Sequence, residues 1–324
     1  MANAYTDTSG SSLGNNLVKA AYDRLVEFAL RSQPQWRAAV DKRPVQQTMP
    51  GSSVIFNLYA DMATATGALT ETTDPDSVAV PSTSTVTVTL NEYGNVALVT
   101  RKLRLLSLSD VDPGIADVIA FNMLDSVDTI VRDVARAGTN VWREVNGGFA
   151  YNSGATNTVR STDLLIGRTV RGTVAKLRNN KSIPRVDGNY LCYVHPDQSV
   201  DLRQQTSNAA WRTPHEYQAA GNIWGGTIGI FEGAQFIETP RIFTAVDGFN
   251  PGVTAATVYR SVMMGKQAVA EAVAEEFGVH IGPVTDKLSR FRPIGWYGVA
   301  GWARYREESL VRIETSSTLS AQMA

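Results

Sequence analysis

A short stretch with strict alternation places the firmest limit on how this chain folds. Residues 85–90 read Thr-Val-Thr-Val-Thr-Leu, so polar and apolar side chains alternate at every position. A period of two is typical of a β-strand with one buried and one exposed face. The segment 53–59, Ser-Val-Ile-Phe-Asn-Leu-Tyr, is its predicted partner. Because two strands alone are only marginally stable in water, we expect this arm to lie on another surface, most simply another copy of the chain.

The charged residues of this arm are all acidic. No Lys or Arg occurs between Arg43 and Arg101, whereas four acids lie in the Thr- and Ala-rich stretch that joins the two predicted strands: Asp61, Glu71, Asp74 and Asp76. Residues 160–185 carry the opposite charge, with seven basic residues and one acid, Asp163. Two interpretations stay open. Both regions are solvated faces, or the acidic arm of one subunit contacts a basic surface of another.

Composition indicates an ordinary globular protein. The chain has 324 residues, of which 43% are hydrophobic and 19% charged, and its net charge is −1. Such a charge gives no strong attraction to nucleic acid or to an anionic membrane. The single cysteine, Cys192, lies in an apolar run and allows no intrachain disulfide, which favours a buried, inert thiol and a reducing cytoplasm. No signal peptide and no apolar stretch of membrane-spanning length are recognisable, so we expect synthesis in the cytoplasm and no membrane partner.

The longest predicted helix follows the arm. Asp112 can cap it and Pro113 suits its first turn, and apolar residues then recur at helical spacing to about Glu144. A helix of that length is a rod of roughly 45–50 Å. The alternative is two helices broken near Gly138. Before this helix, the pattern predicts an amphipathic helix over 13–31, an extended connector over 35–50, a turn over 91–95 and a strand over 96–100.

From about residue 161 the pattern becomes α/β. Helices are predicted over 162–179, capped by Ser161 or Thr162, over 197–204 and over 267–275. Strands are predicted over 190–194 and 258–264, and the glycine-punctuated segment 223–238 is typical of a β-hairpin. The segment 294–313 is predicted to form long strands rich in aromatic residues.

Catalytic motifs are absent from the sequence. His195 follows a predicted strand in His-Pro-Asp, where a turn with Asp197 as a helix cap is the simpler interpretation. His215 and His280 lack partners at metal-ligand spacing, and the glycines 225–233 match no nucleotide fingerprint. The sequence therefore predicts no enzyme, no metal and no cofactor.

The order of the elements and the residues within them resemble a known family. An arm, a long β-loop, a long helix, an α/β region and a returning strand region are similar to the major capsid proteins of tailed phages, whose shared fold was first seen in phage Hong Kong 97. More specifically, the residues resemble the coat protein family of the coliphage N-four type. The resembling segments are 91–100, with Asn-Glu-Tyr-Gly-Asn at its start, 128–140, 193–202, 225–238, 265–268 and 295–297.

The resemblance implies a mixed α+β, Hong Kong 97-like fold and a division of the chain. The implied parts are an N-terminal arm (1–50), an extended β-hairpin loop (51–102), a peripheral domain with the spine helix (103–155), an α/β axial domain (156–285) and a return to the peripheral sheet with a C-terminal tail (286–324). It also implies that the extended loop lies across a neighbouring subunit. No long scaffolding segment and no motif for a covalent cross-link are recognisable, so any scaffold is expected to be a separate protein and the locking to be non-covalent.

The function implied is that of a major capsid protein, which forms hexamers and pentamers of an icosahedral head around double-stranded DNA. Implied partners are a portal protein, possible scaffold and decoration proteins, and packaged DNA held non-specifically. The location is the virion, after assembly in the bacterial cytoplasm. Two alternatives remain: an encapsulin-like compartment, and a hydrolase-like enzyme that works through His195 and Asp197.

Intersubunit contacts can be predicted by charge. We expect the four arm acids, Asp61, Glu71, Asp74 and Asp76, to face basic residues of the adjacent subunit's spine. The candidate partners are Arg132, Arg136 and Arg143.

Overall fold

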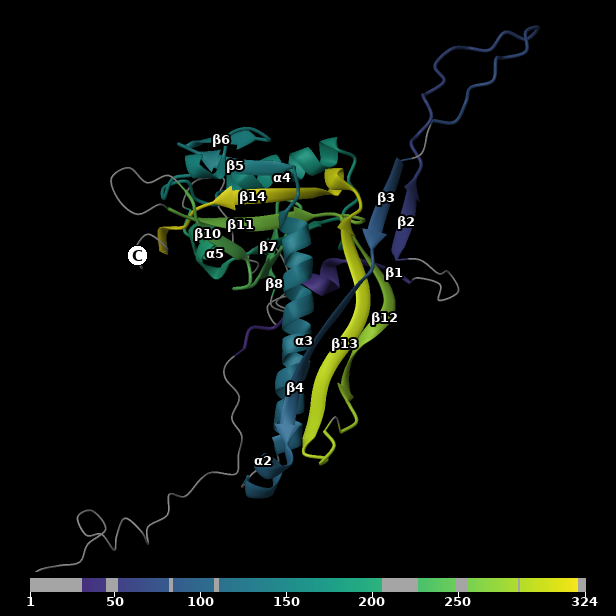
Figure 1. Ribbon diagram of the computed structural model, residues 1–324. Coiled ribbons are helices and arrows are strands. Elements are labelled where there is room, and N and C mark those ends of the chain that lie inside the picture. The colour runs from purple at the N-terminus through teal and green to yellow at the C-terminus, as the bar shows by residue number, and fades with distance from the viewer. Residues whose placement is uncertain are drawn as a thin grey trace, which may run out of the picture.

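The computed structural model describes residues 31–44, 52–81, 84–107, 111–205, 227–248, 256–284 and 286–319. Within these residues the chain forms a lobe of packed helices and strands, a long rod that leaves the lobe, and a hairpin that carries an extended loop (Figure 1). The hairpin and the free end of the rod lie at opposite ends of the molecule (Figure 1). The fold is mixed α+β, as predicted.

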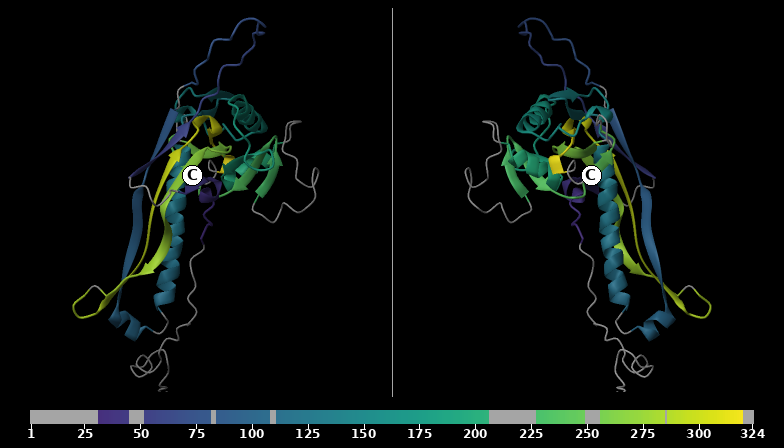
Figure 2. Two further views of the ribbon diagram at one scale, coloured as in Figure 1. Left: turned by 90° about the vertical axis from the view of Figure 1, so that its right-hand side faces the viewer. Right: turned by 90° about the vertical axis from the view of Figure 1, so that its left-hand side faces the viewer.

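The rod is a four-stranded sheet with one long helix along it. Its strands, in spatial order, are β1 (Asp41–Pro44), β12 (Val269–Ile281), β13 (Phe291–Arg304) and β4 (Asn91–Thr100). Helix α3 (Val111–Arg136) covers one face, and short α2 (Arg101–Leu106) lies at the free end (Figures 1 and 2). Ile119 of α3 is buried against Ile294 and Trp296 of β13, because these side chains alternate onto the covered face.

Helix α3 is shorter than predicted. It begins at Val111, so the predicted cap Asp112 lies inside its first turn, and it ends at Arg136; its 26 residues span about 39 Å. The helix does not continue through Gly138, where a Cβ would overlap the Leu310 side chain. The next residues form strand β5 (Val141–Val145), and the two-helix alternative is therefore also wrong. The reason is a partner outside the local sequence, since β5 pairs in parallel with β14 (Leu310–Thr315).

Two other predictions fail for the same reason. The expected turn over 91–95 is the start of β4, which pairs with β13 from residue 91 to residue 100. The expected helix over 267–275 is part of β12, which pairs with β13 on one side and with β1 on the other. A helical spacing of apolar residues is overridden wherever a long neighbouring strand offers a full ladder of hydrogen bonds.

The lobe is built on an eight-stranded sheet. Its spatial order is β6-β5-β14-β11-β7-β9-β8, and β10 also pairs with β11. The strands not yet given bounds are β6 (Gly148–Tyr151), β7 (Tyr190–Val194), β8 (Thr227–Phe231), β9 (Ala234–Glu238), β10 (Phe243–Val246) and β11 (Thr257–Met264). The strand predictions for 190–194, 258–264 and the described part of 223–238 are confirmed.

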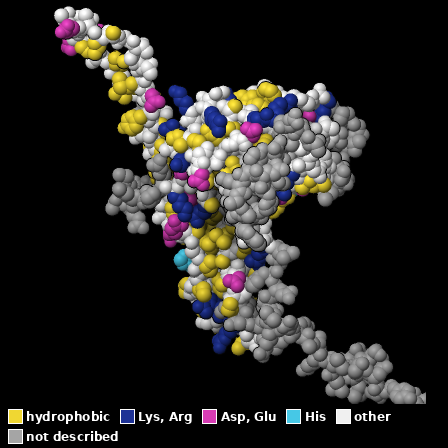
Figure 3. Space-filling model, turned by 180° about the vertical axis from the view of Figure 1, so that it is seen from behind, with side chains coloured by type: hydrophobic (Ala, Val, Ile, Leu, Met, Phe, Trp, Pro, Cys, Tyr) yellow, Lys and Arg dark blue, Asp and Glu magenta, His cyan; other side chains and the backbone are white. Residues whose placement is uncertain are grey.

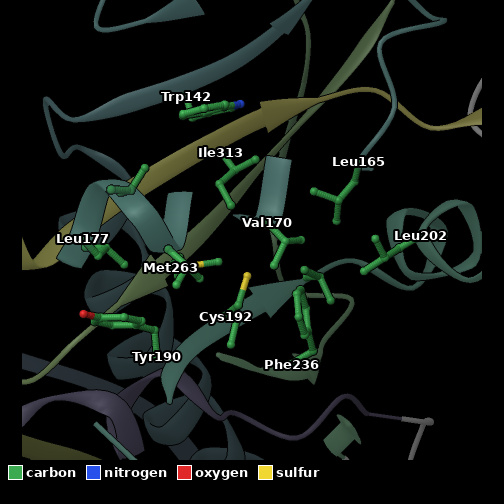
Figure 4. Close-up of a cluster of buried hydrophobic side chains, with 14 residues drawn as sticks. Trp142, Leu165, Val170, Leu177, Tyr190, Cys192, Leu202, Phe236, Met263 and Ile313 are labelled. Atoms are coloured by element: carbon green, nitrogen blue, oxygen red, sulfur yellow. The ribbon is translucent and has the colours of Figure 1, made fainter. Parts of the chain in front are cut away.

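Both faces of this sheet are covered. Along β7, Cys192 and its alternate neighbours face a cluster that includes Val170 and Leu177 of helix α4 (Gly167–Asn179) and Leu202 of helix α5 (Pro196–Arg203) (Figure 4). Leu191 and Tyr193 face the opposite side, where α3 and the segment around Trp36 pack. A strand buried on both faces is continuously apolar, which explains the run Tyr-Leu-Cys-Tyr-Val.

Two helix starts differ from the predictions. Helix α4 begins at Gly167, not at 162, because Asp163 accepts hydrogen bonds from the backbone N–H groups of Arg160 and Gly147 and so belongs to a turn. Helix α5 is confirmed, but its N-cap is His195 and not Asp197.

The N-terminal connector is anchored by Trp36. A 3-10 turn, η1 (Trp36–Ala39), leads into β1, the indole stacks on Tyr193 with ring centroids 4.3 Å apart, and the backbone N–H donates to Asp128 at 2.6 Å. Burial raises the pKa of Asp128, against the opposing effects of this N–H and of Arg241. The predicted helix over 13–31 lies, but for its last residue, outside the described residues.

Candidate assembly surfaces

The predicted two-stranded arm is confirmed. Strands β2 (Ser53–Leu58) and β3 (Ser84–Thr89) pair antiparallel, with Val54 opposite Val88 and Phe56 opposite Val86. Between them, residues 59–80 are all exposed and run out beyond the lobe (Figure 1). We call residues 59–81 the extended loop. The burial of β3 follows the alternation that predicted it, because its valines face inward and its threonines face solvent.

The hairpin is fastened to the end of the rod near the lobe. Phe56 meets the Tyr305 ring edge-on, with centroids 5.7 Å apart, and Val88 is fully buried. Gly301 of β13 lies directly under the carbonyl group of Thr89, where no Cβ fits. These contacts hold the base of the hairpin and leave the extended loop without packing of its own.

The extended loop combines acids with large apolar side chains. All four predicted acids, Asp61, Glu71, Asp74 and Asp76, are exposed, and none forms an ion pair with another described residue. Along the same loop Leu69 is 77% exposed and Tyr59 74%, with Met62, Val78 and Val80 also exposed. Water solvates such apolar groups poorly, so a loop that exposes five of them along its length is suited to meet a partner surface.

The three predicted spine arginines have partners within the subunit. Arg132 and Arg136 both contact Asp133, and the Arg136 guanidinium stacks on Phe243 at 3.5 Å. Arg143 is not on the spine helix but on β5, and its side chain is only 9% exposed. The prediction placed Arg143 on the helix because its apolar neighbours extended the helical pattern.

The structure brings Arg143 into one cluster with Arg260 and Arg312. All three approach the buried Glu314, and the distances from Nε to its carboxylate are 2.6, 3.6 and 2.9 Å respectively. The pKa of Arg312 is lowered, first by burial and then by repulsion from the neighbouring arginines, while Glu314 opposes this shift. This cluster connects β5, β11 and β14 and acts as an internal brace.

The basic region over 160–185 is partly neutralised. Arg168 donates to Glu144 at 2.6 Å, and Arg185 lies 3.3 Å from Asp41. Arg171 lies 3.9 Å from Glu232. Part of the positive charge of residues 160–185 is therefore compensated by acids of the same subunit.

The uncovered face of the rod is apolar and shallowly hollowed. Val96 and Leu98 of β4 are 60% and 62% exposed, and Tyr297 of β13 lies beside them. A hollow of about 420 Å³ lies over Gly295, bordered by His280 among others. Hydrophobic side chains also gather along the rod in the space-filling view (Figure 3). This face has the character of a surface that another chain covers.

The free end of the rod carries a second surface, which the sequence analysis missed. Helix α2 has three basic residues and three leucines in six positions, and none of its residues is buried. Leu105 is 73% exposed and Leu106 74%. The signal was present in the run Arg-Lys-Leu-Arg-Leu-Leu, but six residues are too few for a periodic pattern to indicate a face.

The described residues around His195 give it a structural role at the start of helix α5. Its Nδ1 accepts a hydrogen bond from the backbone N–H of Asp197, and the Asp197 carboxylate accepts one from the Tyr259 hydroxyl at 2.6 Å. Burial lowers the pKa of His195, although Asp197 and Glu238 oppose the shift. The Nδ1 atom of His195 is thus occupied as the N-cap acceptor of α5.

Cys192 is fully buried, and burial raises the pKa of its thiol, which disfavours the reactive thiolate. Among the described residues no group of three or more His, Cys, Asp or Glu side chains is arranged to hold a metal ion. In the same part of the chain, the helices are too short or too polar to cross a bilayer.

Comparison with solved structures finds phage capsids. The capsid of cyanophage P-SCSP1u matches with a TM-score of 0.69 at 12% identity, covering 98% of this chain and 100% of that chain. The capsid of Ralstonia phage GP4 matches with a TM-score of 0.67 at 14% identity, covering 98% and 99% respectively. The capsid of Helicobacter pylori bacteriophage KHP30 matches with a TM-score of 0.66 at 13% identity, covering 97% and 100%. At these identities the likeness concerns the fold.

Sequence comparison is more specific. A search of curated proteins finds no match. A family model described as phage capsid protein, however, matches residues 8–318, which is nearly the whole chain. The protein therefore belongs to the phage capsid protein family.

Proposed function

We propose that this chain is the major capsid protein of a phage head and assembles into hexamers and pentamers of an icosahedral shell around double-stranded DNA. Family membership and the capsid fold support the structural role. One observation carries the assembly step: the extended loop is exposed along its length, carries large apolar side chains and has no core of its own.

The energetics of the loop favour a neighbouring subunit as its support. Full burial of one large apolar side chain is worth about 1.5–3 kcal/mol, and the loop exposes five of them. Ordering a free loop costs conformational entropy that this burial can offset only when another surface is present. Because each subunit would both give a loop and receive one, several weak contacts would add up to a stable closed shell.

We propose a Hong Kong 97-like division of the chain, adjusted to the sheets. Residues 1–50 would be the N-terminal arm, and 51–102 the segment that carries the hairpin and the extended loop and ends with β4, which pairs with β13 of the rod. The peripheral domain would be the rod, so β12 joins it although it lies within 156–285. The axial domain would be the lobe, and it gains β5, β6 and β14 from the flanking segments.

The intersubunit role of the loop acids remains our proposal, and its arginine partners need revision. Arg132 and Arg136 are partly exposed and still available for a shared contact, although Asp133 already neutralises part of their charge. Arg143 pairs with a buried glutamate, so it has little exposed guanidinium to offer. Further proposed partners are a portal protein, separate scaffold or decoration proteins, and packaged DNA held without sequence preference.

Electron microscopy with sedimentation on the chain expressed alone tests this proposal. Closed shells or capsomer-sized rings are the expected result. The matched variant replaces residues 60–80 by a short Gly-Ser linker, which leaves the base of the hairpin intact. It should give a folded subunit that sediments as a monomer. Shells from that variant, or a wild-type chain that stays monomeric even with a scaffold protein added, would contradict the proposal. Shells that carry protein cargo and no DNA in infected cells would favour an encapsulin-like compartment.

A further inference from the structure

We infer that a pocket at the free end of the rod binds a phosphate group. The pocket has a volume of about 370 Å³ and lies between α2 and the turn that joins β12 to β13. Its described lining residues include Arg101, Arg104, Leu105, Ser289, Arg290 and Arg292. The inference goes beyond the proposed function, because it assigns an anionic ligand to the single chain.

Positive charge is concentrated at this end of the rod. The two segments that form the pocket, 100–107 and 286–294, contain six basic residues and one acid, Asp286. Four of the basic residues are arginines that line the pocket, and no described lining residue is an acid. Lys and Arg side chains also gather at the free end of the rod in the space-filling view (Figure 3). Because like charges that converge on one pocket repel each other, an anion that lies among them is attracted by all of them.

Two of the arginines keep their charge available. Arg290 pairs with Asp286 at 2.6 Å, whereas Arg101 and Arg292 form no ion pair with another described residue. Arg292 lies two residues before Ile294 on β13, so both side chains face the side of the sheet that α3 covers. One available guanidinium group therefore comes from the sheet, and the other comes from the start of α2.

Ser289 adds a hydroxyl group to these donors. Its φ angle is 56°, in the left-handed region that residues other than glycine rarely adopt. The turn holds it there, since its backbone N–H donates to the carbonyl group of Asp286 at 2.9 Å. Backbone strain of this kind is concentrated at binding sites, where it fixes the direction of a side chain.

The pocket is held in shape by contacts within the subunit. The backbone N–H of Arg101 donates to the carbonyl group of Arg290 at 2.8 Å, which ties the start of α2 to the opposite turn. The hydroxyl group of Thr100 caps α2 by accepting from the N–H of Leu103 at 3.2 Å. A site that is already ordered loses little entropy when it binds a ligand.

This set of donors suits a phosphate better than a carboxylate. A carboxylate presents two oxygens in one plane, whereas a phosphate presents oxygens in several directions. Guanidinium groups from two elements and a hydroxyl group can therefore each bond a different oxygen of one phosphate. Arginine suits this task, because its planar fork donates two parallel hydrogen bonds. Free phosphate and the DNA backbone share this chemistry, so the experiment has one arm for each.

Equilibrium dialysis of the full chain against radiolabelled inorganic phosphate, at constant ionic strength, tests the inference. The wild type should bind phosphate, and tetrahedral sulfate should compete for the site whereas acetate should not. Arg101→Gln with Arg292→Gln should weaken phosphate binding by about tenfold or more, because charge-assisted hydrogen bonds are lost. The matched control is Arg171→Gln with Lys181→Gln, which removes the same charge from exposed positions of the lobe and should leave binding unchanged.

A second variant separates binding from folding. Ser289→Gly removes the hydroxyl group and relieves the positive φ angle, so it should keep or raise the melting temperature. Phosphate binding should nevertheless weaken by about threefold or more, since one hydrogen bond is lost. Full phosphate affinity in Ser289→Gly would remove the hydroxyl group from the site, and full affinity in the double arginine variant would overturn the inference.

The second arm identifies the source of the phosphate. A short fluorescein-labelled DNA duplex is added to the subunit fraction from sedimentation, and its anisotropy is measured. If the arginine variant weakens DNA binding and the lobe control does not, the DNA backbone occupies the pocket. If only inorganic phosphate depends on the pocket, the ligand is the free anion.

Three further results would overturn the inference. They are competition by acetate as strong as that by sulfate, displacement of phosphate by poly-glutamate at equal charge, and an equal loss of binding in the lobe control. The first and third would indicate general screening of charge, and the second a carboxylate-bearing protein partner. Sedimentation of the same samples reports on shell assembly separately, so a chain that binds phosphate but forms no shells counts against the proposed function alone.

Discussion

The Nε atom of Arg143 lies 2.6 Å from the carboxylate of Glu314, and this contact joins β5 to β14 within the lobe. The same carboxylate serves Arg260 and Arg312. Arg260 also pairs with Asp247 at 2.6 Å, so Arg143 and Arg312 are the two guanidinium groups that rely on Glu314 for compensation. Arg143 follows the long helix and Glu314 lies on the last strand, so the contact connects residues that are 171 positions apart in the sequence.

Glu314→Gln should strongly destabilise the subunit. The substitution keeps the shape but leaves buried arginines without their counter-charge, which typically costs about 3–5 kcal/mol. Urea unfolding on the background of the loop-replaced variant measures this without a contribution from assembly. The exposed Glu308→Gln is the control and should change the free energy of unfolding by less than about 0.5 kcal/mol. Equal stability of the two variants would show that the cluster is not an internal brace.

The cap of α5 should make stability depend on pH. The pKa of His195 is lowered by burial, so the unfolded state binds a proton more readily than the folded state. The stability that neutral His195 contributes is therefore present above its unfolded pKa, near 6.5, and is lost as the pH falls toward the folded value. His195→Asn keeps a capping side chain but cannot titrate. Between pH 7.5 and 5 it should lose less stability than the wild type, and parallel curves would contradict this assignment.

Replacing two glycines by alanine should change the stability of the protein in opposite directions. A Cβ at Gly298 would overlap the Phe277 ring, which stacks on Trp302, so Gly298→Ala should cost about 1–3 kcal/mol. A Cβ at Gly114, in the first turns of α3, has nothing within 4 Å. Gly114→Ala should therefore stabilise by about 0.5–1 kcal/mol. Thermal unfolding of both variants checks the pair, and equal shifts of the melting temperature would show that the ring has room to move.

Reversal of two loop charges should block assembly without unfolding the subunit. Asp74 and Asp76 are fully solvated in the isolated chain, so Asp74→Lys with Asp76→Lys should change the free energy of unfolding by less than about 0.5 kcal/mol. Shell formation should fall sharply, because the loop would then repel a basic partner surface. Wild-type assembly should likewise weaken as salt rises, since exposed charges are screened. Particles of normal yield from the reversed variant would rule out a charge role for these acids.

The candidate surfaces were only partly foreseeable. The acidic loop could be recognised because its composition differs from the rest of the chain over many residues. The partner arginines could not, since whether a guanidinium is exposed depends on which acids the fold brings near it. Arg143 was assigned to the spine on local spacing, whereas its location follows from pairing with a strand far along the chain. The basic rod end was missed because its two segments, α2 and the β12–β13 turn, meet only in space.

The local sequence pattern by itself determined the elements in which buried and exposed residues follow a regular spacing along a short segment. The alternation of 85–90 predicts a strand of the β2–β3 hairpin, the Asp-Pro signal predicts the start of α3 to within two residues, and the continuous apolar run of 190–194 predicts β7. Tertiary structure decided the segments with mixed patterns. Residues 141–144 and 269–275 carry apolar residues at a spacing compatible with a helix, and they form parts of strands because β14 and β13 offer unpaired backbone groups beside them. A backbone that becomes buried must satisfy its hydrogen bonds, and where the partner for those bonds lies far along the chain, no local spacing reveals it.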